Sequence, residues 1–377
     1  MKTQFAAALA ALIALALVPS TVEACSVPVF RFALERWQAE PYEVVVLHAG
    51  KLGAGHAKLV AWLRECSEGF EARTNMEVFV IDVDGEVDND FAELVNTADR
   101  TMLPSLILRY PRRYGAPTPL WEEPLTPQNA QRLIDSPARR KIGMNLLKGD
   151  AAVWVLLTSG DREKDEAAGK LLRTEIDKLA KTLQLPEILP EDVLEEAEAI
   201  PKLEITFSMV TVDRADAKES ALVSMIFGME AEIEVGKEPA VFAVIGQGRA
   251  LPALAGAGIN AVNIRAVAEF CAGPCSCIVK DQNPGVDLLT SVDWEALPDG
   301  KWVKPQPLPD LTDVGMFVGK TEAPSAQPDD TPAAEAPPDG VAADTGVFPI
   351  TLVAVLGLAV LGVLIATFIL TRHRREA

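Results

Sequence analysis

The chain has 377 residues, of which 49% are hydrophobic and 24% are charged, and its net charge at pH 7 is −19. Such an acidic protein repels nucleic-acid phosphates, so we expect no nucleic-acid partner. The hydrophobic content is high enough for folded cores, and about 280 residues between the terminal segments suit two domains of ordinary size.

The first 24 residues have the features of a secretory signal peptide. Lys2 precedes an apolar stretch over residues 5–18, and residues 22–24 (VEA) form a cleavage site with small residues. Cleavage after Ala24 leaves Cys25 as the first mature residue. A lipid on Cys25 is an alternative, but Glu23 is an unusual neighbour for that processing. We therefore expect plain secretion.

The C-terminal end predicts a membrane anchor. Residues 348–370 (FPITLVAVLGLAVLGVLIATFIL) form an uncharged run of the length that a helix needs to cross a bilayer. The basic residues that follow favour a cytoplasmic tail. We predict a signal peptide (1–24), a transmembrane helix (347–371) and a cytoplasmic tail (372–377). The exported region then lies in the periplasm or on the cell surface, and membrane contact is through the C-terminal helix.

Between these ends, short apolar runs alternate with helical patterns. In the first half we predict strands at 42–48, 76–83 and 105–110, and helices at 29–37, 57–66, 91–95 and 126–134. In the second half we predict strands at 151–157, 203–212 and 240–246, and helices at 159–183, 217–227 and 259–270. Residues 304–346 are rich in proline, alanine and acidic residues, which predicts a disordered linker.

In each half the third strand is preceded by a proline, Pro104 in the first and Pro239 in the second. This order of elements resembles the thioredoxin fold. The resemblance implies an α/β chain with two tandem thioredoxin-like modules, at residues 25–149 and 150–303. It also makes Pro104 and Pro239 candidates for the cis-proline that lies beside the active site in that fold. One larger α/β domain is the alternative.

A redox-active thioredoxin carries Cys-x-x-Cys where its first strand meets a helix, because the helix N-terminus lowers the thiol pKa. The corresponding stretches here, HAGKLGAGHA (48–57) and LTSGDREKDE (157–166), contain no cysteine. We therefore predict a membrane-anchored binding or scaffold protein with a protein partner of unknown identity. We predict no catalytic residue, no cofactor and no metal site.

The chain has five cysteines, and an exported location favours disulfides. Cys271, Cys275 and Cys277 lie close together in CAGPCSC, and we favour a structural disulfide that joins this cluster to Cys25 or Cys66. A membrane-tethered oxidoreductase or redox sensor that uses the cluster is a second hypothesis. Binding of a soft metal such as Cu(I) is a third.

Two further motifs favour turns over binding sites. The acidic run DVDGEVDND (82–90) lacks the glycine and the glutamate positions of a calcium loop, so we expect a solvated turn. GQGR (246–249) lacks the third glycine of a dinucleotide loop, so we expect a hairpin turn. From the signal peptide through VPVFRFALERW (27–37) and the turn QNPGVDLL (282–289) to the anchored tail, the chain also resembles a family of secreted bacterial proteins with one C-terminal membrane anchor. This resemblance implies no activity.

Overall fold

The computed structural model describes residues 25–68, 73–114, 119–195, 197, 202–229, 238–275 and 280–304. All of these residues belong to one compact unit. The predicted signal peptide, transmembrane helix and cytoplasmic tail lie outside the described residues, as does the predicted linker beyond residue 304. Within the described part, no helix is both long and apolar enough to cross a membrane.

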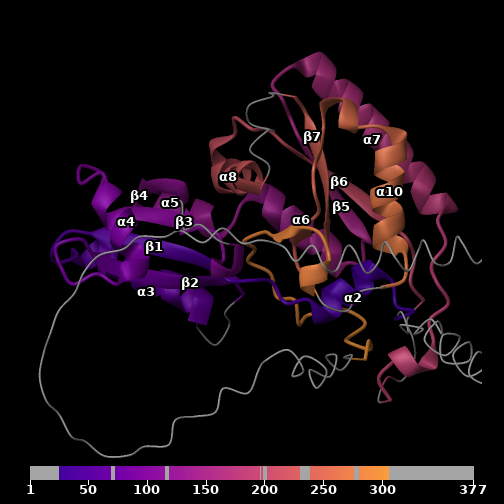
Figure 1. The fold of residues 1–377 in the computed structure, drawn as a ribbon, viewed down its shortest axis with the longest axis horizontal. Coiled ribbons are helices and arrows are strands. Elements are labelled where there is room, and N and C mark those ends of the chain that lie inside the picture. Colours follow the sequence, from indigo (N-terminus) through magenta and orange to yellow (C-terminus); the bar gives the residue numbers. More distant parts are fainter. Residues whose placement is uncertain are drawn as a thin grey trace, which may run out of the picture. The chain divides into compact units, whose positions relative to one another are not determined.

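The protein is an α/β protein with two mixed sheets (Figure 1). The first sheet has the order β2-β1-β3-β4 and consists of β1 (Tyr42–His48), β2 (Met76–Asp82), β3 (Ser105–Arg109) and β4 (Pro119–Pro124). Strands β1 and β2 are parallel, whereas β3 is antiparallel to both β1 and β4. The helical elements of this region are α3 (Ala54–Glu68), α4 (Asn89–Thr97), η1 (Arg112–Tyr114) and α5 (Pro127–Ile134).

The second sheet has the order β10-β8-β7-β5-β6, with β9 paired to β7. Its strands are β5 (Ala152–Leu157), β6 (Phe207–Val212), β7 (Ala240–Ile245), β8 (Arg249–Ala250), β9 (Leu254–Ala255) and β10 (Val286–Asp287). Strands β5 and β6 are parallel, and β7 is antiparallel to β5 and β8. The spatial strand order β2-β1-β3-β4 of the first sheet, with its strand directions, therefore matches the order β6-β5-β7-β8 of the second.

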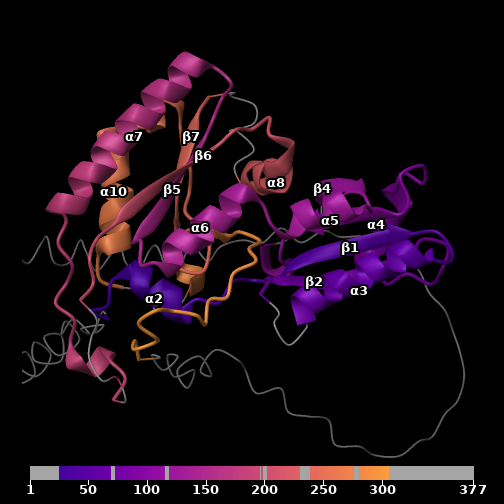
Figure 2. The same cartoon turned by 180° about the vertical axis from the view of Figure 1, so that it is seen from behind.

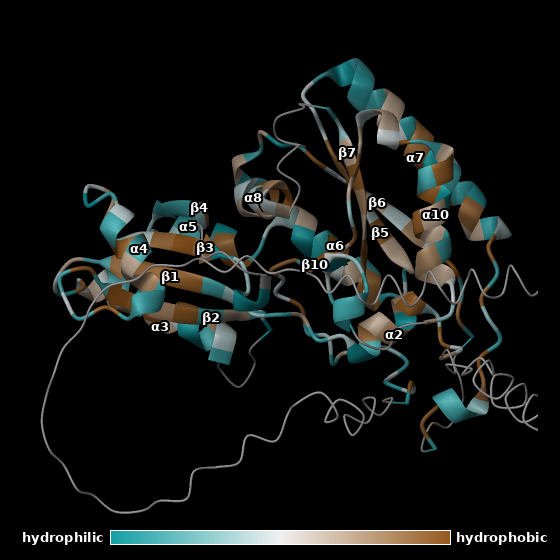
Figure 3. Cartoon of the chain, in the orientation of Figure 1, coloured by the Kyte–Doolittle hydropathy of each residue, from teal (hydrophilic) through white to brown (hydrophobic). Residues whose placement is uncertain are grey.

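The helical elements of the second region are α2 (Val29–Arg36), α6 (Pro137–Leu147), α7 (Arg162–Thr182), η2 (Pro190–Asp192), η3 (Ala217–Glu219), α8 (Ser220–Met229), η4 (Gly256–Gly258), α10 (Ala261–Ala272) and η5 (Lys280–Gln282). Helices α7 and α10 lie side by side on one face of the second sheet (Figure 2). The strands at the centre of each sheet are largely hydrophobic, whereas much of α7 is hydrophilic (Figure 3). This distribution leaves one side of α7 for the core and the other for solvent.

Strand β5 of the second sheet is buried along its whole length. Its odd-numbered residues, such as Val155, share a core cluster with residues of the first sheet, such as Val44. Its even-numbered residues, such as Trp154, pack in a second cluster with α7, α10 and α2. Because side chains alternate along a strand, β5 contributes to two hydrophobic cores.

Helix α2 packs on the second sheet, which differs from the predicted division into modules at 25–149 and 150–303. Phe32 and Ala33 belong to the same buried cluster as Trp154. A Cβ atom on Gly246, in the turn after β7, would lie 2.6 Å from Ala33 Cβ. This close approach explains why a residue without a side chain stands in that turn, and it assigns the N-terminal helix to the second sheet.

The peptide bond between Leu103 and Pro104 is cis, as expected from the resemblance. It is the sole cis bond within the described ranges, so the expectation for Pro239 is corrected to a trans bond. The carbonyls on both sides of the Pro239 bond have fixed partners there. Arg214 donates to Glu238 O at 3.0 Å, and Gly256 N donates to Pro239 O at 3.1 Å.

Candidate functional site

The junction between β1 and α3 is the first place where the resemblance predicts a site. His48 ends β1 and stands opposite Asp82 of β2. Its Nδ1 atom lies 2.8 Å from Gly50 O, and Gly50 N donates to Asp82 Oδ1 at 2.9 Å. Hydrogen bonds from the amides of Asp84 and Gly50 lower the pKa of the Asp82 carboxyl. The junction is a hydrogen-bonded turn around an ionised carboxylate and contains no thiol.

The junction between β5 and α7 is closed in a similar way by carboxylates. Asp161 caps α7 by accepting hydrogen bonds from Glu163 N at 3.1 Å and Lys164 N at 3.3 Å. Asp165 accepts from both Ser159 N at 2.7 Å and Ser159 Oγ at 2.8 Å. The contacts of Asp161 satisfy two free amides at the start of the helix, and those of Asp165 hold the preceding turn, so the second junction also acts as a structural turn.

A groove of about 540 Å³ lies between α7 and the outer part of the second sheet. Apolar residues from three elements line it, namely Leu156, Gly169 and Met209. Charged side chains of both signs from α7 also border it, namely Asp165, Glu166, Lys170, Arg173 and Asp177. Strand β6 forms this edge of the sheet, and in the described part of the chain it pairs with β5 alone.

The structure brings three of the five cysteines that were candidates for a disulfide into one core. Cys25, Cys271 and Cys275 are buried in the cluster that covers the α7–α10 face of the second sheet. Residues 27–29 pair with residues 273–275, because Cys275 N donates to Val27 O and Val29 N donates to Gly273 O, both at 2.9 Å. The N-terminal segment therefore lies against the Cys271–Cys275 stretch.

Cys66 lies elsewhere, on α3, where it packs against the core of the first sheet. Cys25, Cys66 and Cys271 are free thiols in this structure. Of the two candidate partners for the cluster, the structure therefore places Cys25 in the same core and Cys66 in another. Cys277 lies outside the described residues, and the predicted disulfide stays a prediction.

The environment of these thiols disfavours thiolate chemistry. Burial raises the pKa of Cys271 to about 12. Burial also raises the pKa of Cys25 to about 11, assisted by the carboxylate of Asp192 and opposed by the amide of Val27. At neutral pH both sulfurs are protonated, and a protonated thiol is a poor nucleophile and metal ligand. Across the described ranges, no group of three or more His, Cys, Asp or Glu side chains could hold a metal ion.

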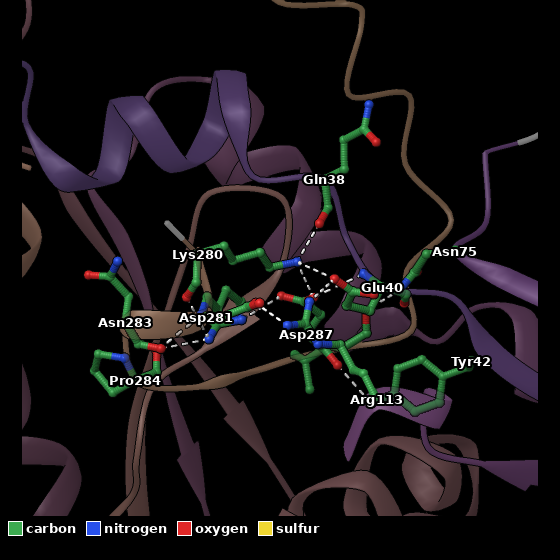
Figure 4. A network of polar contacts seen from close by, with 12 residues as sticks. Gln38, Glu40, Tyr42, Asn75, Arg113, Lys280, Asp281, Asn283, Pro284 and Asp287 are labelled. Carbon is green, nitrogen blue, oxygen red and sulfur yellow. Dashed lines mark hydrogen bonds and ion pairs between the residues drawn. The ribbon is translucent and has the colours of Figure 1, made fainter. Parts of the chain in front are cut away.

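A buried polar network connects the two sheets, and the sequence analysis did not identify it (Figure 4). Asp287 of β10 forms an ion pair with Arg249 of β8 at 3.3 Å and another with Lys280. The Asp287 carboxylate accepts from Glu40 N at 2.9 Å, and Tyr42 Oη donates to Asp287 O at 2.7 Å. Because these donors surround the carboxylate, we interpret the network as a structural connection between β1 and β10. A lone aspartate in a turn-rich stretch gave no signal of it.

The acidic run and the GQGR motif take the predicted turn conformations. Residues 83–85 form a turn after β2, and Asp88 then caps α4 by accepting a hydrogen bond from Asp90 N at 3.1 Å. Gly246 and Gly248 have positive φ angles between the antiparallel strands β7 and β8. Both predictions of turns are confirmed.

No protein-family model matches the chain, and no curated protein is significantly similar to it. The functional conclusion therefore depends on the geometry described above.

Proposed function

We propose that the chain is a membrane-anchored, extracytoplasmic binding or scaffold protein built on two thioredoxin-like modules without redox activity. The observation that carries this proposal is the content of the two strand–helix junctions. Both are turns closed by carboxylates, at Asp82 in the first and at Asp161 and Asp165 in the second. A thioredoxin-like oxidoreductase needs a low-pKa cysteine at this position.

Two further observations support the proposal. The two sheets repeat the same strand order and the same strand directions, which is the arrangement that a tandem of thioredoxin-like modules requires. The buried thiols of Cys25 and Cys271 have raised pKa values, so neither supplies a thiolate for exchange or for copper. An oxidoreductase or copper-handling function would then depend on the other three cysteines, Cys66, Cys275 and Cys277.

We place partner binding at the groove between α7 and β6. The outer backbone groups of an edge strand can pair with an extended segment of another protein, and the apolar residues of the groove can hold alternate side chains of that segment. Leu156 and Met209 provide the apolar surface, and the charged side chains of both signs along α7 can pair with charged residues of either sign. The partner we propose is therefore a protein with an extended stretch of apolar and charged residues.

The absence of redox activity is tested with the purified full-length chain in detergent. We expect that it reduces insulin no faster than dithiothreitol alone, because no accessible thiolate is present at either junction. The four-residue substitution that replaces Cys25, Cys66, Cys271 and Cys275 by alanine controls for contributions of the described thiols. Insulin reduction at the rate of an equimolar thioredoxin would refute the proposal.

The groove is tested by site-specific photo-crosslinking in intact cells. A photoreactive amino acid at exposed Thr211 of β6 is expected to give a discrete protein adduct. The matched control is the same replacement at Thr182, an exposed threonine at the end of α7 that does not border the groove. Loss of the adduct in Met209→Asp would support binding in the groove. Equal adducts from both positions, or none from Thr211, would argue against this surface.

A further inference from the structure

The first residues after the predicted leader are part of the folded core. Cys25 is 5% exposed and Ser26 is 8% exposed. Ser26 donates twice to the carboxylate of Asp192, from its backbone nitrogen at 2.7 Å and from its hydroxyl at 2.6 Å. The Cys25 thiol hydrogen-bonds the same carboxylate, and Leu189 N donates to Ser26 Oγ at 2.7 Å. The buried carboxylate of Asp192, on η2, therefore binds the first residues of the predicted mature chain through hydrogen bonds.

The same segment also holds the other end of the folded unit. The carbonyl of Asp192 accepts a hydrogen bond from Lys304 N at 2.8 Å, and Val193 pairs with Val303. Asp192 itself is 6% exposed. Residues 189–194 thus fix both the first described residues and the last residues before the predicted linker.

A charge created at Cys25 would lie near this carboxylate. Three backbone bonds separate Cys25 N from Ser26 N, which limits the distance between the two nitrogens to about 4 Å. Since Ser26 N is 2.7 Å from Asp192 Oδ2, the nitrogen of Cys25 lies within about 7 Å of that oxygen. In the uncut chain this nitrogen is a neutral amide, whereas in the mature chain it is an ammonium group.

We propose that removal of the leader after Ala24 creates an α-ammonium group on Cys25 that pairs with Asp192, and that Cys25 carries no lipid. A leader peptidase hydrolyses the Ala24–Cys25 bond with one water molecule. The carboxylate formed leaves with Ala24, and the freed amine of Cys25 takes up a proton. A lipid on Cys25 Sγ would have to pass through the core that buries this side chain. The inference rests on the exported location in the proposed function, but not on partner binding.

The N-terminal peptide of the mature full-length chain gives the first test. Mass spectrometry of protein purified from membranes is expected to find an unmodified Cys25 with a free amine as the first residue. A diacylglyceryl or acyl mass on Cys25 would overturn the proposal, as would a start at another residue. Because insulin reduction and photo-crosslinking are measured separately, a modified Cys25 would leave the proposed binding function standing.

The ion pair is tested by a cycle of two changes in the full-length chain. Asp192→Asn keeps an oxygen that can accept from Ser26 but removes the charge. It is expected to lower the melting temperature of the mature form by at least about 5 °C. In a form that retains Ala24, the ammonium group moves one residue away, and the loss is expected to be less than half as large. Equal losses in the two forms would overturn the ion pair.

A control variant and an amine-labelling measurement complete the test of the ion pair. Glu191→Gln, which removes an exposed carboxylate beside Asp192, is the matched control and is expected to leave the melting temperature unchanged. If Asp192→Asn does not fold, the unsubstituted chain is treated with an amine-reactive reagent. The α-amine of Cys25 is then expected to react at least tenfold more slowly in the folded chain than in urea. Equal rates in the folded and unfolded chains would overturn the proposal.

Discussion

The two sheets share one strand arrangement but fill the same position with opposite chemistry. In the first sheet, Glu43 of β1 stands opposite Arg109 of β3, and their side chains form an ion pair at 3.2 Å. In the second sheet, the corresponding pair on β5 and β7 is Val153 opposite Val244. In both sheets this pair lies four positions from the residue that follows the proline. The strand pairing therefore accommodates either a charged or an apolar pair.

The surroundings of the two pairs explain the difference. Arg109 lies over the ring of Phe91 at 5.2 Å, and exposed Arg112 reaches Glu43 from the solvent side. Glu43 and Arg109 are buried, so their charges are neutralised by each other and by Arg112. Val153 and Val244 are buried as well, but both belong to a hydrophobic cluster, where an ion pair would lose its hydration. The neighbours of the pair, charged in the first sheet and apolar in the second, and not the strand order, therefore decide which chemistry the position tolerates.

The largest expected effect concerns the core of the second sheet, around β5. Trp154→Ala removes a fully buried indole from β5 and is expected to lower the free energy of unfolding by about 3–5 kcal/mol. Urea denaturation of the full-length chain in detergent, followed by circular dichroism, measures this change. The matched control is Trp62→Ala on α3, where the side chain is exposed, and its effect is expected to stay within about 0.5 kcal/mol. Similar losses for the two tryptophans would contradict the assignment of β5 to the core.

The second prediction concerns the buried ion pair. Glu43→Gln leaves Arg109 buried beside a neutral group and is expected to destabilise the chain by about 3 kcal/mol. The double substitution Glu43→Val with Arg109→Val copies the pair of the second sheet. It is expected to recover most of this loss, because an apolar pair needs no compensation for lost hydration. The same urea titration measures both variants, and a double variant less stable than Glu43→Gln would break the correspondence between the sheets.

The smallest expected effect compares one helical glycine from each region. A Cβ atom on Gly143 of α6 would lie 2.4 Å from Val292 Cγ2, whereas one on Gly55 of α3 meets no atom within 4 Å. Gly143→Ala is therefore expected to cost about 1–3 kcal/mol through overpacking. Gly55→Ala is expected to stabilise the chain by about 0.5–1 kcal/mol, since alanine favours the helix. Thermal unfolding distinguishes the two signs, and a loss of stability in Gly55→Ala would contradict the open environment of α3.

Much of the secondary structure was predictable because its signals are local. The run YEVVVLH predicted β1 with its observed ends, and Thr126 followed by Pro127 predicted the start of α5, where Thr126 Oγ1 accepts from Asn129 N. The same kind of signal at Ser136 and Pro137 marks the start of α6, which the sequence analysis missed. The strands β8, β9 and β10 have two residues each, and their existence depends on pairing between distant segments.

The candidate sites also divide into those that local sequence predicts and those that depend on distant contacts. The absence of cysteine from both strand–helix junctions is readable in the sequence, and so is the turn at Gly246. The network around Asp287 and the contact of Asp192 with Ser26 could not be predicted from the sequence, because the partners lie far apart along the chain. A single aspartate has no periodicity that could predict such partners.

By itself the sequence determined the α/β class, most strands and helices, and the lack of a thiol at either junction, because each of these follows from neighbouring residues. Only the tertiary structure decided that α2 belongs to the second sheet, that Cys25 shares a core with Cys271, and that Glu43 meets Arg109. These outcomes depend on which apolar faces pack together and on which buried charges find partners. Both are set by contacts between residues distant in the chain.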